Sequence, residues 1–206
     1  MCVCHIFDWS VISAVVPSVM SMSSCGVGGT AALLVVDMSV EQVSDTLYRR
    51  VQVLNNIRAL CAETGNFFVC RYDCRLWIED ASSTSLSRIY PNVGIASTKG
   101  AELLPELADC AIEFVGKTTY SSFFASQLHA KLQEHNISDV FVCGINTDYC
   151  VFATALDAFY HMYNVYIVED ACSSIAGKRA HAEGIRRAQN HFPHPCIVQT
   201  QDILDQ

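Results

Sequence analysis

Three side chains that together could cleave an amide bond stand at separate places in this sequence: the carboxylate of Asp37, the ammonium group of Lys117 and the thiol of Cys150. Each follows a short apolar segment that predicts a buried β-strand. The carboxyl ends of parallel strands meet at one edge of a sheet, where α/β proteins bind their ligands. Taken singly, Lys117 could be a solvated lysine and Asp37 the cap of a turn. Taken together, they are the groups that nucleophilic amide hydrolysis needs.

The segment around Cys150 is the most informative part of the chain. Residues 140–143 are apolar and end at a glycine, which predicts a strand buried on both faces. Residues 151–159 are almost wholly apolar and predict a buried helix, for which Thr147 or Asp148 could provide the cap. Cys150 then lies in the first turn of that helix, where the helix dipole favours a thiolate.

These positions predict a mechanism. The Cys150 thiolate would attack an amide or carbamoyl carbon, and Asp37 would carry the proton to the leaving nitrogen and later activate water. Lys117 would stabilise the thiolate and hold Asp37 in place. The backbone N–H groups of Asn146 and Cys150 would receive the oxyanion.

The rest of the chain supplies the elements that must position these residues. Apolar runs predict strands at residues 31–36, 67–70, 111–115, 140–143, 163–168 and 196–199. Helical spacing predicts helices at residues 43–61, 122–135, 151–159 and 180–189. Their alternation predicts an α/β, three-layer Rossmann-like fold with a mostly parallel six-stranded sheet and helices on both faces. The Ser-rich residues 77–100 form a long connecting loop of the kind that often covers a site.

Composition narrows the function classes. The chain has 206 residues, 51% of them hydrophobic, and a net charge of −8 without a Lys/Arg cluster. We therefore expect a full hydrophobic core, and neither nucleic acid nor a membrane as a partner. The odd count of 11 cysteines fits reduced thiols and a cytoplasmic location better than a disulfide framework. The seven histidines show no common spacing on a helix face, and we expect them at the surface.

Residues 1–29 differ from the remainder. They contain no Lys or Arg and include an apolar run interrupted by Pro17, which is too short for a membrane helix and lacks the positive start of a secretory signal. We interpret residues 1–29 as an irregular N-terminal arm packed on the domain or on a partner subunit, and we expect a homo-oligomer. Residues 30–206 are interpreted as one hydrolase domain.

From about residue 30 to residue 200 the sequence resembles the isochorismatase-like cysteine hydrolases, a family that includes nicotinamidases and N-carbamoylsarcosine amidase. The similar segments are LLVVDM, KGAELLPEL, GKTTYSSFF and CGINTDYCVFATALDAF. The resemblance implies the catalytic triad Asp37, Lys117 and Cys150 and a cis peptide between Ile145 and Asn146. Isochorismatase itself lacks the cysteine, so Cys150 places the chain on the amidase side of the family.

The chain departs from the metal-binding nicotinamidases. Their Asp-Trp-His segment is Asp73-Cys74-Arg75 here, and Ala81 and Val93 fall near the other two histidine positions. We therefore predict no metal and no cofactor, since a lone carboxylate is a poor first-row metal site.

The expected substrate is a small carboxamide or carbamoyl compound, cleaved with water through a thioester. The candidates for substrate contacts are Arg71, Arg75, Tyr120 and Tyr149, although Arg71 or Arg75 could instead pair with Glu79 or Asp80. Nicotinamidase activity is the alternative, because the TDYC segment is similar to the corresponding segment of nicotinamidases. An inactive scaffold of the same fold is the second alternative.

Overall fold

Six strands form one sheet in the order β3-β2-β1-β4-β5-β6, and all neighbours run parallel. The computed structural model describes residues 30–63, 66–192 and 196–206. The strands are β1 (Thr30–Val36), β2 (Phe68–Leu76), β3 (Glu113–Lys117), β4 (Ile137–Ile145), β5 (Asn164–Ser173) and β6 (Ile197–Val198). The predicted six-stranded parallel sheet is confirmed.

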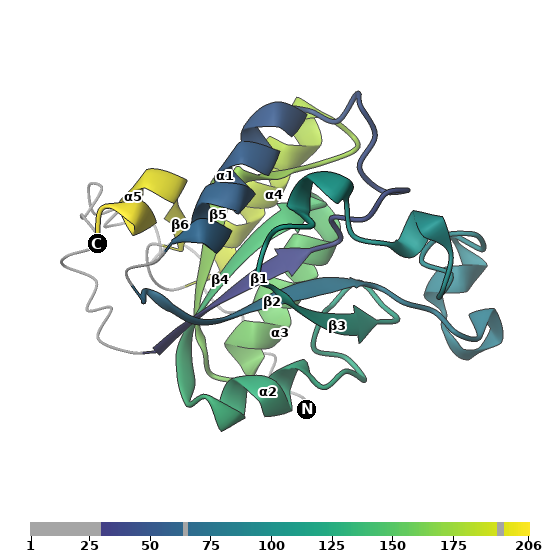
Figure 1. Ribbon diagram of the computed structural model, residues 1–206, viewed down its shortest axis with the longest axis horizontal. Coiled ribbons are helices and arrows are strands. Elements are labelled where there is room, and N and C mark those ends of the chain that lie inside the picture. Colours follow the sequence, from purple (N-terminus) through teal and green to yellow (C-terminus); the bar gives the residue numbers. More distant parts are fainter. Residues whose placement is uncertain (1–29, 64–65, 193–195) are drawn as a thin grey trace, which may run out of the picture.

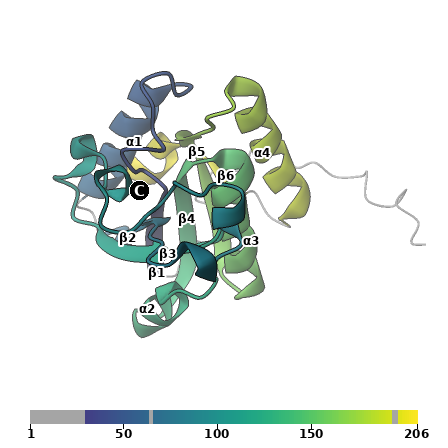
Figure 2. The same cartoon turned by 90° about the vertical axis from the view of Figure 1, so that its right-hand side faces the viewer.

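Helices cover both faces of this sheet. On one face lie α1 (Arg50–Ala62) and α5 (Thr200–Leu204). The other face carries α2 (Leu128–Glu134), α3 (Phe152–Tyr160) and α4 (Lys178–His191). Figure 1 shows α2 and α3 on one side of the strands, and Figure 2 shows α1 opposite α3 and α4. This is the arrangement that right-handed crossovers produce, and the predicted three layers are confirmed.

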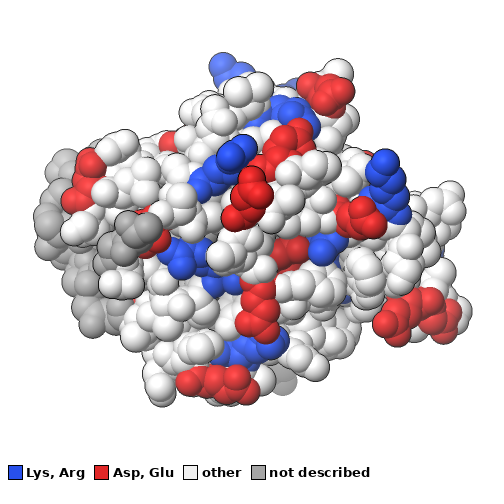
Figure 3. Space-filling model, viewed as in Figure 1, with Lys and Arg blue, Asp and Glu red and all other residues white. Residues whose placement is uncertain are grey.

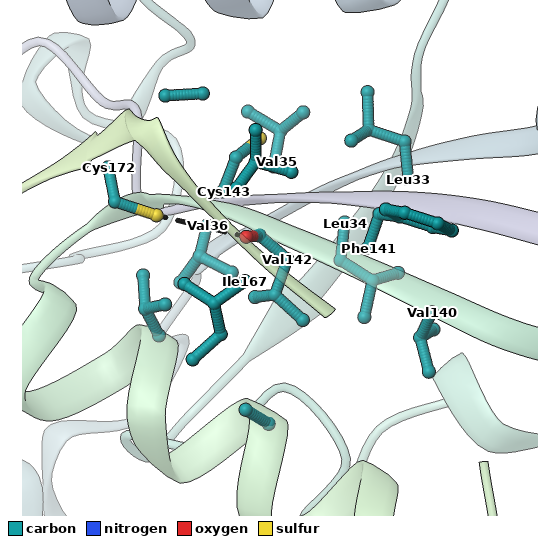
Figure 4. Close-up of a cluster of buried hydrophobic side chains, with 14 of the residues drawn as sticks. Leu33, Leu34, Val35, Val36, Val140, Phe141, Val142, Cys143, Ile167 and Cys172 are labelled. Carbon is teal, nitrogen blue, oxygen red and sulfur yellow. Dashed lines mark hydrogen bonds between the residues drawn. The ribbon is translucent and has the colours of Figure 1, made fainter. Parts of the chain in front are cut away.

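The two central strands, β1 and β4, are buried on both faces. Leu33 and Leu34 of β1 and Val140 and Phe141 of β4 have no exposed surface, although successive residues of a strand point to opposite faces. Figure 4 shows these side chains above and below the two strands. The ring of Phe141 stacks on Tyr166, with centroids 4.6 Å apart. Burial of each such side chain contributes about 1.5–3 kcal/mol, which explains why these strands read as continuous apolar runs.

Two predicted helices are shorter than their apolar spacing indicated. The segment predicted as helix 43–61 becomes α-helical only at Arg50, because Arg49 adopts a left-handed conformation with φ 48°. Val43 and Leu47 are nevertheless buried, in turns that precede the helix. The segment predicted as helix 122–135 is interrupted at Ala125, whose φ is 50°. Periodic burial was therefore recognised correctly, but the regular backbone was overestimated.

The structure bears on the expectations for the N-terminal arm, the cysteines, the surface charge and membrane-spanning helices to different degrees. The predicted arm, residues 1–29, lies outside the described residues, so the arm and the homo-oligomer stay predictions. Eight cysteines of the described part are free thiols: Cys61, Cys70, Cys74, Cys110, Cys143, Cys150, Cys172 and Cys196. On the face shown in Figure 3, acidic and basic side chains are interspersed. In the part of the chain that the structure describes, no helix is both long and apolar enough to span a bilayer.

We predict that Gly144 cannot be replaced without a large loss of stability. It is the last residue but one of β4 and has φ 106°, and a Cβ there would lie 2.2 Å from the Val36 carbonyl oxygen. Gly144→Ala should lower the free energy of unfolding by more than about 4 kcal/mol, because it combines backbone strain with a backbone clash. Urea titration monitored by circular dichroism measures this change.

Gly177→Ala is the matched control. Gly177 also has a positive φ, 88°, but a Cβ there would meet nothing within 4 Å. Its cost should be the conformational part alone, about 1–3 kcal/mol. Equal losses in the two variants would show that the close approach of β4 to β1 is unimportant.

Candidate active site

Asp37 directly follows β1 and is held by the neighbouring strand β2. Its backbone N–H donates to the Cys74 carbonyl over 2.9 Å, and its Oδ1 accepts the Leu76 N–H over 3.0 Å. The residue has no exposed surface and adopts φ 53°. Asp tolerates this left-handed conformation better than most residues, and such strain clusters at functional sites. The turn aims the carboxylate across the carboxyl ends of the strands.

Lys117, the last residue of β3, meets this carboxylate. Its Nζ lies 2.8 Å from Asp37 Oδ2, and neither side chain has any exposure. The same ammonium group donates to the Thr119 carbonyl over 2.9 Å. Burial acts to lower the pKa of Lys117, but the nearby Asp37 carboxylate and Cys150 outweigh it, so the pKa is raised. Lys117 is therefore charged, and its charge is balanced by Asp37.

Cys150 completes the cluster. It lies in a π-helical turn, Thr147–Val151, that precedes α3, and its Sγ is 3.6 Å from Lys117 Nζ. Burial raises the pKa of the Cys150 thiol, Asp37 raises it further, and Lys117 only partly opposes them. Burial of the sulfur and the adjacent carboxylate thus favour a neutral resting thiol and oppose the thiolate that the helix terminus favours, so the predicted thiolate is not supported.

The turn between β4 and Cys150 is fixed by side chains. The Ile145–Asn146 peptide is cis, which confirms the expectation from the family resemblance. Asn146 Oδ1 accepts the Ile175 N–H over 2.8 Å, and the Thr147 hydroxyl donates to the Ser173 carbonyl over 2.9 Å. The sequence suggested Thr147 or Asp148 as the cap of this helix, but the N-cap of α3 is Val151, without a side-chain hydrogen bond. The role of the Asn146 and Cys150 backbone N–H groups as an oxyanion hole stays a prediction.

Two of the predicted substrate-contact residues lie beside Cys150. The rings of Tyr120 and Tyr149 are tilted against each other, with centroids 5.7 Å apart, and Tyr149 is 53% exposed. Burial raises the pKa of the Tyr120 phenol, and Tyr90 and Cys150 add to the shift. Tyr90 belongs to the long loop after β2. The sequence did not indicate a role for it, because the Ser-rich residues around it carry no motif. The structure thus brings three tyrosines to the neighbourhood of the thiol.

The structure does not bring Arg71 to this site. Arg71 pairs in the sheet with Leu33, which is four residues before Asp37 and so about 13 Å from it along the strand. Its guanidinium donates to the Glu63 carbonyl over 2.7 Å and pairs with the Glu63 carboxylate at 3.4 Å. Arg71 therefore stabilises the connection between α1 and β2, and a substrate contact is incompatible with this place.

Arg75 is nearer, but two of its nitrogens already donate to groups within the protein. Its Nε donates to Asp73 Oδ2 over 2.7 Å, its Nη1 donates to the Ala101 carbonyl, and its guanidinium lies 4.6 Å from the Phe114 ring centroid. Its side chain is only 12% exposed. Arg75 is thus held within the protein rather than presented to a substrate. Glu79 or Asp80 was the expected alternative partner of Arg75, whereas the structure pairs Arg75 with Asp73.

These contacts also decide whether a metal fits. Asp73 would be the one ligand shared with the metal-binding relatives, yet one of its oxygens holds Arg75. Within residues 30–63, 66–192 and 196–206, no three side chains of His, Cys, Asp or Glu are grouped as metal ligands would be. The guanidinium carries a positive charge where a cation would bind. The residues present do not fit the metal site of the nicotinamidases.

The fold and the site define an α/β protein with a buried Asp-Lys-Cys cluster at the carboxyl edge of its sheet. The chain belongs to the isochorismatase family, because the profile of the isochorismatase domain matches residues 31–200. A cysteine hydrolase from Pseudomonas syringae pv. phaseolicola has the same fold, with a TM-score of 0.75 and 22% sequence identity over 85% of this chain and 91% of that chain.

The curated relatives include proteins that are named for amide hydrolysis. The nicotinamidase of Escherichia coli is 33% identical over 99 residues, which cover 42% of this chain and 46% of that protein. The ureidoacrylate amidohydrolase RutB of Variovorax paradoxus is 32% identical over 92 residues, covering 45% of this chain and 35% of that protein. The chain therefore spans less than half the length of these two relatives.

We predict that Cys150 behaves as a buried thiol rather than as an activated thiolate. Because its pKa is raised by burial and by Asp37, the thiolate fraction should grow about tenfold per pH unit from pH 7 to pH 9. Alkylation by iodoacetamide, followed at Cys150 by peptide mass spectrometry, should rise in proportion. A rate that levels off below pH 8 would show a low pKa and would contradict the neutral resting thiol.

Proposed function

We propose that this protein is a cysteine-dependent amidohydrolase that acts on a small carboxamide or carbamoyl compound. One observation carries the proposal: Cys150 Sγ lies 3.6 Å from a Lys117 ammonium group that is itself paired with Asp37 at 2.8 Å, in a buried cluster. A nucleophile, a base and an orienting cation are the parts of a nucleophilic hydrolase. The names of the relatives support this class of reaction.

In the first half of the proposed reaction, the Cys150 sulfur attacks the carbonyl carbon and its proton passes to Asp37. The tetrahedral intermediate collapses when Asp37 gives that proton to the leaving nitrogen. A thioester and free ammonia or amine result. The neutral resting thiol suits this sequence, because the proton that the leaving group needs is still on the enzyme when substrate binds.

In the second half, Asp37 takes a proton from water and the hydroxide attacks the thioester carbon. The thiol leaves with that proton, and the acid product is released. Lys117 keeps its contact with Asp37 and lies close enough to the sulfur to stabilise negative charge on it during both halves. The backbone N–H groups of Asn146 and Cys150 are the proposed oxyanion donors.

We further propose that the reaction needs no metal. The support is the Asp73–Arg75 ion pair of 2.7 Å, which uses the only nicotinamidase-like ligand that the sequence retains. Carbamoyl compounds, which carry their own N–H donors and carbonyl acceptor, can be oriented by polar protein groups alone. Tyr120 and Tyr149 are the remaining candidates for contacts with the substrate. Arg71 and Arg75 are no longer candidates, because both are engaged within the protein.

Nicotinamide hydrolysis is the second candidate. The segment matching the nicotinamidase of E. coli and the paired rings of Tyr120 and Tyr149, 5.7 Å apart, favour it, because aromatic side chains can stack on a pyridine ring. An inactive scaffold has less support, because a scaffold has no need for a buried Asp-Lys-Cys cluster.

We predict that Cys150→Ala abolishes ammonia release while the fold is retained, since the nucleophile is lost and the side chain is small. Asp37→Asn should lower kcat by about 10²-fold or more. A panel of ureido acids, N-carbamoyl compounds, aliphatic carboxamides and nicotinamide, scored for ammonia, identifies the substrate for this assay. Cys143→Ala, which removes another buried thiol, is the matched control and should stay active. Turnover by Cys150→Ala would end the cysteine-hydrolase proposal.

We predict that activity survives removal of metal ions. Dialysis against a strong chelator should leave kcat and KM unchanged, because Arg75 occupies the Asp73 carboxylate. Elemental analysis of the purified protein should find less than stoichiometric zinc, iron or manganese. A zinc-dependent amidase treated in parallel shows that the chelator works. Activity that is lost on chelation and restored by one metal would return nicotinamidase to first place.

A further inference from the structure

His181 is buried beside the turn that carries Cys150, contrary to the expectation that the histidines are surface residues. It lies in the first turns of α4 and is only 3% exposed. Its Nδ1 is 2.8 Å from the Thr147 hydroxyl oxygen, and its Nε2 is 2.7 Å from Nη2 of Arg49. Both ring nitrogens are thus engaged with partners that come from other elements of the fold.

The chemistry of these partners fixes the tautomer of His181. A guanidinium group can only donate hydrogen bonds, so Nε2 must accept from Arg49. A neutral imidazole then carries its proton on Nδ1 and donates it to Thr147 Oγ1. The Thr147 hydroxyl in turn donates a hydrogen bond to the Ser173 carbonyl over 2.9 Å. The result is a chain of hydrogen bonds with a single direction, from Arg49 through His181 and Thr147 to Ser173.

Arg49 and Thr147 of this chain are also held by contacts outside it. Arg49 also donates to the Glu169 carbonyl over 2.7 Å. On the helix side, Gly184 of α4 lies so near the turn that a Cβ would be 2.7 Å from the carbonyl carbon of Thr147. Thr147 has no exposed surface and opens the five-residue turn that contains Cys150. A displacement of Thr147 therefore moves the turn and its sulfur.

We propose that neutral His181 is a positioning residue that, through Thr147, holds the turn of Cys150 in its reactive place. It does not touch the reacting atoms and acts only through the geometry of the turn. The catalytic meaning of this role rests on the proposed function, but its geometric effect can be measured without a substrate. The readout is the reactivity of the Cys150 thiol toward iodoacetamide.

The first test compares two replacements of Thr147. Thr147→Val keeps the shape but removes the hydroxyl, so the alkylation rate of Cys150 at pH 8 should change by roughly tenfold or more, because the rate depends on the access and protonation of the sulfur that the turn sets. Thr147→Ser keeps the hydroxyl and should react within about threefold of the wild type, since the donor and acceptor remain. His191→Asn, an exposed histidine of the same helix, is the control and should match the wild type.

A purely structural role gives a different pattern. If Thr147→Val lowers the melting temperature but leaves the alkylation rate of the folded protein unchanged, the proposal is overturned. This result would leave the amidohydrolase proposal intact, because that proposal depends on the Cys150→Ala assay. Conversely, turnover by Cys150→Ala would show that the position of Cys150 does not matter for catalysis. The alkylation rates would still measure the effect of His181 on the geometry of the turn.

The second test uses pH and decides the matter even if Thr147→Val does not fold. Burial and the Arg49 charge lower the pKa of His181 to about 4, whereas Glu169 and Asp148 act in the opposite direction. Tyr48 also faces the ring, with centroids 5.9 Å apart. The chain of hydrogen bonds is therefore complete at neutral pH and is lost only as the pH falls through about 4.

Arg49→Met removes the charge that opposes protonation, so the pKa of His181 should rise and the chain should break at higher pH. The ratio of the Arg49→Met alkylation rate to the wild-type rate should therefore change steadily between pH 8 and pH 5, as His181 becomes protonated. A second substitution in the same protein, Thr147→Val or Thr147→Ala, should abolish this pH dependence. The hydrogen bond between His181 and residue 147 is then already absent, so protonation of His181 cannot break it. A ratio that is independent of pH would overturn the proposal.

Discussion

The buried ion pair between Asp37 and Lys117 is the constraint on which the rest of the site depends. Both side chains lack any exposure, so neither charge could be left alone: removal of one partner of a buried pair costs about 3–5 kcal/mol. The two residues leave strands β1 and β3, which are separated in the sheet by β2. The pair therefore requires Asp37 to turn across β2, and the Leu76 N–H of β2 satisfies its second oxygen. Its place between the strand ends also determines where a nucleophile must stand.

The close approach of β4 to β1 brings Cys150, the proposed nucleophile, to the pair. Gly144 has no side chain where a Cβ would lie 2.2 Å from the Val36 carbonyl oxygen, and the chain can then turn through Asn146 towards Cys150. This is also the position in the sheet order where the connections diverge, since β1 leads to β2 on one side and β4 leads to β5 on the other. Such a switch point leaves a crevice at the carboxyl edge. Topology and local sequence thus select the same place.

The sequence predicted the sheet well because its central strands are buried on both faces and read as continuous apolar runs. It also predicted that Asp37, Lys117 and Cys150 would meet, since all three follow such runs. It failed where the deciding partner is distant in the chain. His181 is buried by contacts with residues 34 and 132 positions away, and no local pattern encodes them. For the same reason the sequence does not show the burial and the Asp37 contact that raise the pKa of the Cys150 thiol and oppose the effect of the helix terminus.

The charges of the site now restrict what part of a substrate can be buried there. Asp37 is paired with Lys117, and Asp73 is paired with Arg75, so the four ionised groups already balance. A substrate carboxylate placed among them would be desolvated without a new counter-charge, whereas a neutral amide loses less on burial and can be compensated by hydrogen bonds. The group next to the sulfur should therefore be the neutral carbonyl that is cleaved. Any carboxylate of the substrate would remain at the wetter side of the site, where Tyr149 is 53% exposed. In the proposed reaction, recognition of the substrate would then depend on shape and hydrogen bonding near the tyrosines rather than on an arginine within the sheet.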